Sequence, residues 1–129
     1  MAVPETGQGR ARELYAAATG TDGARFELAA DVADNLAAAC DRLVEDLRKA
    51  MATGHCVTQV AGFPDLPSGH GLASGFAEKG HQFLDTMTAF QETALLFKAA
   101  YLAAGHRLAD AEAANRAALA LVTDYLEPR

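Results

Sequence analysis

Apolar residues recur along residues 24–52 at alternating steps of three and four. This spacing brings side chains to one face of an α-helix every seven residues, so it predicts a long helix with a continuous apolar seam. The seam positions are Phe26, Ala29, Ala33, Leu36, Cys40, Leu43, Leu47 and Ala50. The opposite positions carry many charged side chains, which predicts a solvated face.

A stronger repeat runs through residues 71–126, where phenylalanines stand seven residues apart. The repeat consists of Phe76, Phe83, Phe90 and Phe97, with Met87, Ala94, Tyr101 and Leu108 at the companion positions. It predicts a second, longer helix that overhangs the first. Matched repeats favour antiparallel packing, so we expect the large rings to point inward onto the small side chains of the first helix. The predicted fold is an all-α antiparallel helical hairpin of two long helices.

The connector between the two helices, about residues 54–70, is longer than a usual helix–helix connection. Its apolar residues predict that it folds back and caps the tip of the hairpin. The residues expected in this cap are Val57, Val60, Phe63 and Leu66. We expect Asp65 or Ser68 to accept hydrogen bonds from the amides that open the second helix. Gly71 and Gly75 are expected to let a facing backbone approach closely.

Residues 1–22 are expected to form a flexible tail or a short extra helix over residues 10–19, ahead of a helical-hairpin domain at residues 23–129. A second apolar line follows the C-terminal half of the second helix, beside the phenylalanines. It consists of Leu95, Ala99, Leu102 and Ala109. Burial between two helices alone contributes too little free energy to offset the conformational entropy that the chain loses on folding. We therefore expect another segment or chain to bury this second apolar line. We expect a helical partner chain, or else the N-terminal tail, to do so.

The composition supports a helical fold and excludes several classes of protein. Thirty of the 129 residues are Ala and only 7% are aromatic, which excludes a β-sandwich or β-barrel. The net charge of -6 argues against a nucleic-acid-binding surface, which needs clustered Lys and Arg. No apolar stretch approaches the roughly 20 residues of a membrane span, so we expect no stable membrane insertion. The N-terminus carries no recognisable signal peptide, so synthesis in the cytoplasm is expected.

Residues with catalytic or ligand-binding chemistry are sparse. The histidines form no ligand pattern with each other or with Cys40 and Cys56, so we expect no metal site. Cys40 falls on the seam and Cys56 has no evident activating environment, so neither predicts nucleophilic catalysis. Gly69, Gly71 and Gly75 do not form a dinucleotide fingerprint and follow no predicted strand. We therefore expect no enzyme activity and no cofactor.

Two further features accompany the paired helices: the turn segment at residues 63–69, and Tyr101 followed by Asp110 and Glu112 toward the C-terminus. With these features, residues 24–126 resemble the Trp-x-Gly helical-hairpin proteins of actinobacteria, although the turn carries no Trp. Members of that family leave the cell through type VII (ESX) secretion and pair as four-helix bundles. The resemblance implies a helical partner, and it implies an export signal at Tyr101, Asp110 and Glu112.

The sequence therefore predicts a non-enzymatic protein that acts by pairing with another helical chain. In the leading hypothesis the protein is a substrate or escort of type VII secretion and is exported from the cytoplasm. The alternative is a homodimeric helical adaptor or regulatory bundle that stays in the cytoplasm. A monomer that acquires a defined partner favours the first hypothesis, and a stable self-dimer favours the second.

Overall fold

The computed structural model describes residues 2–20, 25–54 and 61–127. Within these ranges the chain forms four α-helices and no β-strand. The helices are α1 (Gln8–Thr19), α2 (Ala30–Gly54), α3 (Pro67–Ala104) and α4 (Leu108–Leu126). The all-α prediction is confirmed, and the short N-terminal helix that the sequence allowed is α1.

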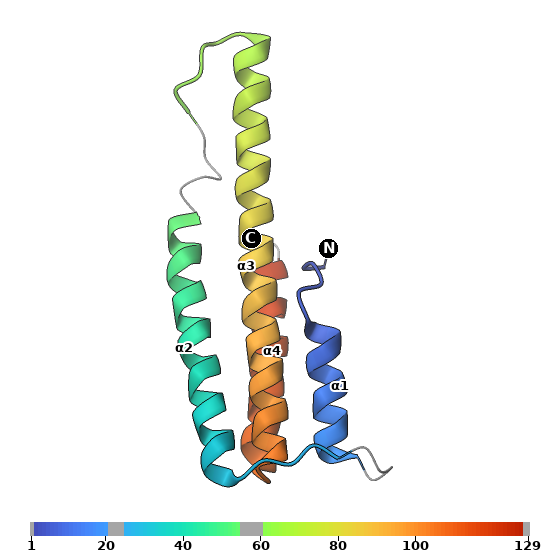
Figure 1. The fold of residues 1–129 in the computed structure, drawn as a ribbon. Coiled ribbons are helices and arrows are strands. Elements are labelled where there is room, and N and C mark those ends of the chain that lie inside the picture. Colours follow the sequence, from blue (N-terminus) through green and yellow to red (C-terminus); the bar gives the residue numbers. More distant parts are fainter. Residues whose placement is uncertain (1, 21–24, 55–60, 128–129) are drawn as a thin grey trace.

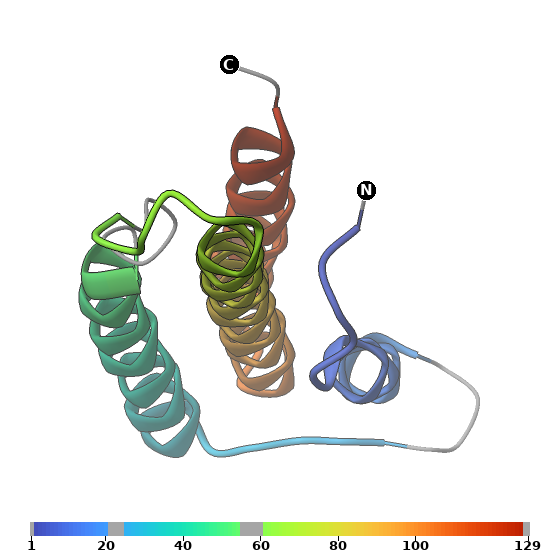
Figure 2. The same cartoon turned by 90° about the horizontal axis from the view of Figure 1, so that it is seen from above.

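Helix α3 lies at the centre of the molecule, with α1, α2 and α4 around it (Figure 1, Figure 2). Every close helix–helix contact in the described residues involves α3. Helices α2 and α4 run antiparallel to α3, whereas α1 runs parallel to it (Figure 1). The predicted antiparallel hairpin is therefore present as α2 and α3. The N-terminal part of α3, green to yellow in Figure 1, extends beyond the ends of the other helices.

The predicted single helix over residues 71–126 is instead two helices, because the chain reverses after α3. A Schellman motif closes the end of α3. The His106 amide donates a hydrogen bond to the Ala103 carbonyl at 3.0 Å. The Arg107 amide donates one to the Leu102 carbonyl at 2.8 Å. His106 takes the left-handed backbone conformation of this motif, with φ at 65°, and α4 consequently runs back along α3.

Gly105 allows α3 to end directly beside the first turn of α2. A β-carbon built on Gly105 would collide with the β-carbon of Ala33. Arg107 Nη2 also donates a hydrogen bond to Asp34 Oδ2 at 2.8 Å, which ties the turn to the same end of α2. The sequence signal for the break is Gly105 followed by His106, since helices often end at a glycine. Because the seven-residue repeat continues from Tyr101 to Leu108 across this signal, the sequence predicted one uninterrupted helix.

Small side chains fill the contacts between α3 and its neighbours. One cluster of buried residues draws on all four helices: Ala11, Val44, Ala94, Leu95, Leu96 and Ala118. A second cluster lies nearer the α3–α4 turn: Ala37, Leu102, Ala103 and Ala111. Because alanine lets the helix axes approach closely, these close-packed contacts leave little space for aromatic rings.

The prediction that the phenylalanine repeat points inward onto α2 is wrong. Phe76, Phe83 and Phe90 are 55%, 39% and 41% exposed, and Phe97 is half-buried. Helix α3 packs against three neighbours, and smaller side chains occupy the sides that face them. A seven-residue repeat places these rings on one side of α3 but does not say which neighbour that side meets.

Helix α2 packs on a different side of α3, which carries Thr88, Gln91 and Lys98. The Thr88 hydroxyl and the Gln91 side-chain amide donate to the Met51 sulfur at 3.6 Å and 2.9 Å. Lys98 Nζ lies 2.8 Å from Asp41 Oδ1. Polar contacts therefore flank the apolar packing between α2 and α3.

The other predicted seam residues divide into two groups. Leu43 and Leu108 are exposed, so their placement in the seam is wrong. The half-buried members are Phe26, Leu36, Cys40, Leu47, Met87 and Tyr101. The Phe26 ring meets the Tyr101 ring edge-on, with centroids 6.3 Å apart. Helix α2 begins at Ala30 and not near residue 24, so Phe26 precedes it and makes this contact from the segment between α1 and α2.

The apolar line assigned to a partner chain is mostly covered by α4. Leu95, Ala99 and Leu102 are 8%, 0% and 5% exposed, and Leu95 shares a buried cluster with Ala118 of α4. Ala109 is exposed. The assignment of Leu95, Ala99 and Leu102 to a partner is therefore wrong, because the reversal after α3 lets the chain cover this line itself.

The described part of the connector folds back onto α3. The Phe63 ring stacks on the Phe76 ring, with centroids 5.9 Å apart, as the cap prediction requires. Leu66 is exposed and occupies the N-cap position of α3 without a side-chain hydrogen bond. Capping by Asp65 or Ser68 is therefore wrong, and Ser68 lies inside the first turn of the helix. The predicted cap residues outside the described ranges are Val57 and Val60.

The close backbone approach expected at Gly71 and Gly75 is found at Gly69 instead. Nothing lies within 4 Å of a β-carbon built on Gly71 or Gly75. A β-carbon on Gly69 would collide with the Pro64 carbonyl oxygen. Because α3 begins at Pro67 rather than near residue 71, the tight contact falls in its first turn.

The C-terminal end of α4 is tied to α3 by the Tyr125 hydroxyl, which donates a hydrogen bond to Asp85 Oδ1 at 2.5 Å. Burial, followed by the Asp85 contact, raises the pKa of Tyr125 above its usual value of 10.0. The unfolded chain ionises this tyrosine first, so the stability that Tyr125 contributes falls as the pH rises above about 10. Tyr125→Phe is expected to lower the free energy of unfolding by about 1 kcal/mol near neutral pH and to flatten this alkaline decline. Urea denaturation across a pH series measures both effects, and an unchanged alkaline slope would contradict the assignment.

Candidate functional site

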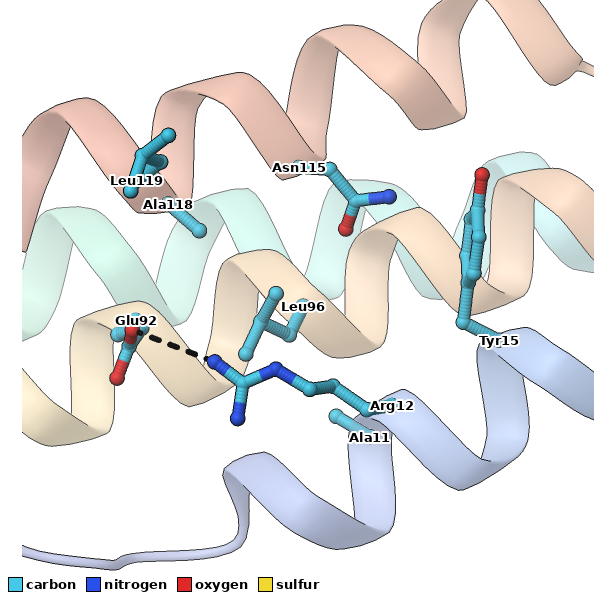
Figure 3. A pocket seen from close by; sticks show the side chains of 8 residues that line it. All are labelled: Ala11, Arg12, Tyr15, Glu92, Leu96, Asn115, Ala118 and Leu119. Carbon is cyan, nitrogen blue, oxygen red and sulfur yellow. Dashed lines mark ion pairs between the residues drawn. The ribbon is translucent and has the colours of Figure 1, made fainter.

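A cavity of about 320 Å³ lies between α1 and α4, over the surface of α3 (Figure 3). All three helices contribute side chains to its wall. The lining residues are Ala11, Arg12, Tyr15, Glu92, Leu96, Asn115, Ala118 and Leu119. The cavity exists because α1 and α4 both pack on α3 without packing closely on each other.

One side of this cavity is polar and carries two opposite charges. Arg12 Nη2 lies 3.8 Å from Glu92 Oε2, which is longer than a direct hydrogen bond. Glu92 Oε1 also accepts a hydrogen bond from Gln8 Nε2 at 2.9 Å. The Glu92 carboxylate thus has a donor that is independent of Arg12. Figure 3 shows the Asn115 amide projecting from α4 toward α3, and Tyr15 standing at one end of the cavity.

The remaining wall of the cavity is apolar. Ala11, Leu96 and Ala118 are buried and form its inner part, where α1, α3 and α4 meet. Leu119 is 69% exposed and lies at the rim. The cavity therefore combines an apolar surface with a charged pair, which is the usual composition of a small-molecule site.

The residues just before α1 position this helix against α3. Gly7 precedes α1 with φ at 124°, a conformation that glycine adopts without strain. The Thr6 and Thr93 hydroxyls share a hydrogen bond of 2.8 Å. Gln8, which is buried, accepts a hydrogen bond from the Thr6 amide at 2.6 Å. This network fixes the register of Arg12 relative to the α3 side of the cavity.

A second cavity of about 300 Å³ lies between α3 and α4 on their other side. Leu95 and Leu102 line it together with Asp110 of α4. Lys98 also lines it, but its ammonium group is engaged by Asp41 of α2.

A row of exposed rings, here named the phenylalanine strip, consists of Phe76, Phe83 and Phe90. The seven-residue spacing keeps the rings on one side of α3, over a length of about 21 Å. Leu72, one turn before Phe76, is exposed as well. Single exposed apolar residues are common on protein surfaces, whereas an ordered row of large ones is typical of an interaction surface.

The same side of α3 is covered by the chain itself near the α3–α4 turn. Phe97 and Tyr101 continue the repeat there, with ring centroids 6.0 Å apart. Phe26 packs on Tyr101, and the Leu28 amide donates a hydrogen bond to the Ala104 carbonyl at 2.9 Å. The segment between α1 and α2 therefore covers one end of the repeat. Phe63 stacks on Phe76 at the other end, and Phe83 and Phe90 between them remain partly exposed.

The residues assigned to an export signal do not share one helix. Tyr101 lies on α3, half-buried against Phe26 and Phe97. Asp110 and Glu112 lie on α4 and are exposed. The chain reversal after α3 separates the tyrosine from the two carboxylates, whereas the sequence predicted a single helix over residues 71–126.

The half-buried cysteine of α2 has an environment unsuited to nucleophilic chemistry. Burial, followed by the negative charge of Asp41, raises the pKa of the Cys40 thiol, although Lys98 opposes this shift. A raised pKa keeps the thiol protonated, and a protonated thiol is a poor nucleophile. Cys40 therefore acts as a small packing residue between α2 and α3.

Sequence reasoning missed the cavity between α1, α3 and α4. Residues 108–126 looked like the continuation of the second helix, so Asn115 and Leu119 were not expected near α1. Recognising the break at Gly105 would have brought α4 back alongside α3. Even then, Arg12 and Glu92 come together only because α1 packs on α3 in one particular orientation, and no local sequence pattern specifies that orientation.

No helix of the described ranges is long and apolar enough to cross a lipid bilayer. Those ranges also hold no group of three His, Cys, Asp or Glu side chains placed to bind a metal ion. No protein-family model, curated protein or solved structure matches the chain.

Proposed function

We propose that this protein is a non-enzymatic helix-pairing protein that binds a helix of another chain along the phenylalanine strip. The observation that carries the proposal is the exposure of Phe76, Phe83 and Phe90 in one row. Complete burial of an exposed Phe contributes about 1.5–3 kcal/mol, and these rings are 39–55% exposed, so each can contribute roughly half of that to binding. Anchors at a regular helical spacing suit a partner that is itself a helix.

In this proposal the partner is a helical protein, and the pair is exported by type VII secretion with this chain as substrate or escort. The antiparallel α2–α3 hairpin and the acidic, Ala-rich composition support this setting. The separation of Tyr101 from Asp110 and Glu112 removes the support of a helical export signal. The pairing part of the proposal does not depend on export.

The alternative partner is a second copy of the chain, which would make the protein a homodimeric adaptor. The even spacing of the strip favours this alternative. In an antiparallel pair related by a two-fold axis at Phe83, Phe76 of each copy lies opposite Phe90 of the other. Such a self-complementary surface is what a two-fold dimer requires.

The double substitution Phe83→Asp and Phe90→Asp is expected to abolish pairing while leaving the fold intact. Loss of two buried rings and introduction of two charges should weaken the complex at least about 100-fold. Phe83 and Phe90 are 39% and 41% exposed in the single chain, so the substitutions also remove some internal packing, and each should lower the free energy of unfolding by about 1–2 kcal/mol. Light scattering of the chain, alone and after co-expression with neighbouring reading frames, measures the molar mass of the complex.

The matched control is Leu108→Asp, which adds a charge at an exposed leucine outside the strip. This variant should pair normally. A complex that survives the double substitution, or that is lost equally in the control, would show that the strip is not the pairing surface. Assay of the culture filtrate for the tagged chain separates export from pairing, since an unexported chain that forms a self-dimer supports the adaptor.

A further inference from the structure

The cavity between α1, α3 and α4 lies on the opposite side of α3 from the phenylalanine strip. Glu92 and Leu96 line the cavity, and Glu92 is two residues from Phe90, which places it about 200° around the helix. A helix bound to the strip would therefore leave the cavity open. The proposed pairing function gives this cavity no role.

The charges of the cavity favour a ligand that carries both signs. Glu92 is mostly buried, with its side chain 13% exposed, whereas the Arg12 side chain is 62% exposed. Their facing atoms lie 3.8 Å apart, so neither group is saturated by the other. An anion at Arg12 would meet the Glu92 carboxylate, and a cation at Glu92 would meet the Arg12 guanidinium. A zwitterion can satisfy both groups at once, with its carboxylate on Arg12 and its ammonium on Glu92.

The apolar wall and the volume of the cavity determine the character and size of the remaining part of the ligand. Leu96 lies beside the charged pair, and the exposed Leu119 lies at the rim. The volume of about 320 Å³ is near the lower limit for small-molecule sites, so it suits a ligand the size of one amino acid. Asn115 supplies a side-chain amide near the same opening (Figure 3).

The geometry points to a binding site for a small zwitterion with an apolar side chain, of the class of free leucine or phenylalanine. The α-carboxylate of the ligand binds the Arg12 guanidinium, and its α-ammonium binds the Glu92 carboxylate on the side away from Gln8. The side chain packs on Leu119 and on the exposed edge of Leu96. Gln8 keeps its hydrogen bond to Glu92 and holds that carboxylate in place.

Titration of the intact chain with L-leucine and L-phenylalanine, followed by amide chemical shifts in NMR, tests this site. Shifts are expected at residues lining the cavity and not along the phenylalanine strip. N-acetyl-L-leucine lacks the ammonium and L-leucinamide lacks the carboxylate, so each should bind at least about tenfold more weakly than leucine. No cavity shifts at millimolar amino acid, or equal binding of either analogue, would overturn the proposal.

Variants of the chain give a second test. Arg12→Gln should weaken leucine binding at least about tenfold, whereas Arg10→Gln, on the same helix with an 85% exposed side chain, should not. Leu119→Asp should also weaken binding. Leu119 is 69% exposed, so the variant should keep the melting temperature of the natural chain, which a thermal melt checks. Arg10→Gln and Arg12→Gln variants that bind leucine equally would refute the carboxylate contact. Since pairing is measured with the strip variants, failure here leaves the helix-pairing proposal standing.

Discussion

Replacement of Leu102 by Ala is expected to lower the free energy of unfolding by about 2–5 kcal/mol. Leu102 is 5% exposed and shares a buried cluster with Ala37 of α2 and Ala111 of α4. Tyr15 of α1 packs against the same cluster. Leu102 therefore belongs to a cluster that joins α3 to α2 and α4. The neighbouring alanines are too short to fill the space that the substitution leaves, so the remaining cavity adds a large part of the lost free energy.

Urea denaturation followed by circular dichroism measures this effect, and Leu108→Ala is the matched control. The control makes the same chemical change at the exposed first residue of α4. It should alter the free energy of unfolding by less than about 0.5 kcal/mol. Similar small losses for both variants would mean that α4 does not pack on α3 and that the four-helix core is incorrect.

Gly105→Ala is expected to destabilise the protein by about 1–3 kcal/mol, through overpacking at the contact between α2 and α3. Gly105 has φ at -90° and ψ at 12°, which alanine tolerates. The loss therefore comes from collision of the new β-carbon with that of Ala33, and not from backbone strain. Relief of the collision requires the first turn of α2 to move away from the end of α3.

A double-mutant cycle with Ala33→Gly isolates this collision. In the Ala33→Gly background, Gly105→Ala should cost at least about 1 kcal/mol less than in the natural chain. Gly71→Ala is the control for helix propensity, because nothing lies within 4 Å of its added β-carbon. It should stabilise the protein by about 0.5–1 kcal/mol. Additive effects in the cycle would rule out the close approach of α2 to the α3–α4 turn.

Part of the candidate surfaces could be predicted from particular residues. The phenylalanine repeat correctly placed Phe76, Phe83 and Phe90 on one side of a helix, and Phe63 of the connector folds back onto that side by stacking on Phe76. The cavity could not be predicted, because Arg12, Glu92 and their neighbours come from helices far apart in the chain. No local spacing relates such residues, and their meeting depends on how α1 and α4 dock on α3.

The sequence by itself determined that the chain is helical, that α2 and α3 form an antiparallel hairpin, and which residues share a face of each helix. These properties follow from alanine content, heptad spacing and the prolines of the connector. Only the tertiary structure decided which face meets which neighbour, because a heptad pattern is unchanged when a helix rotates about its own axis. That rotation is set by contacts between distant segments: the close approach of Gly105 to Ala33, and the packing of α1 and α4 on α3. Those contacts bury the sides of α3 that carry alanine and leucine, so that the phenylalanine strip faces solvent.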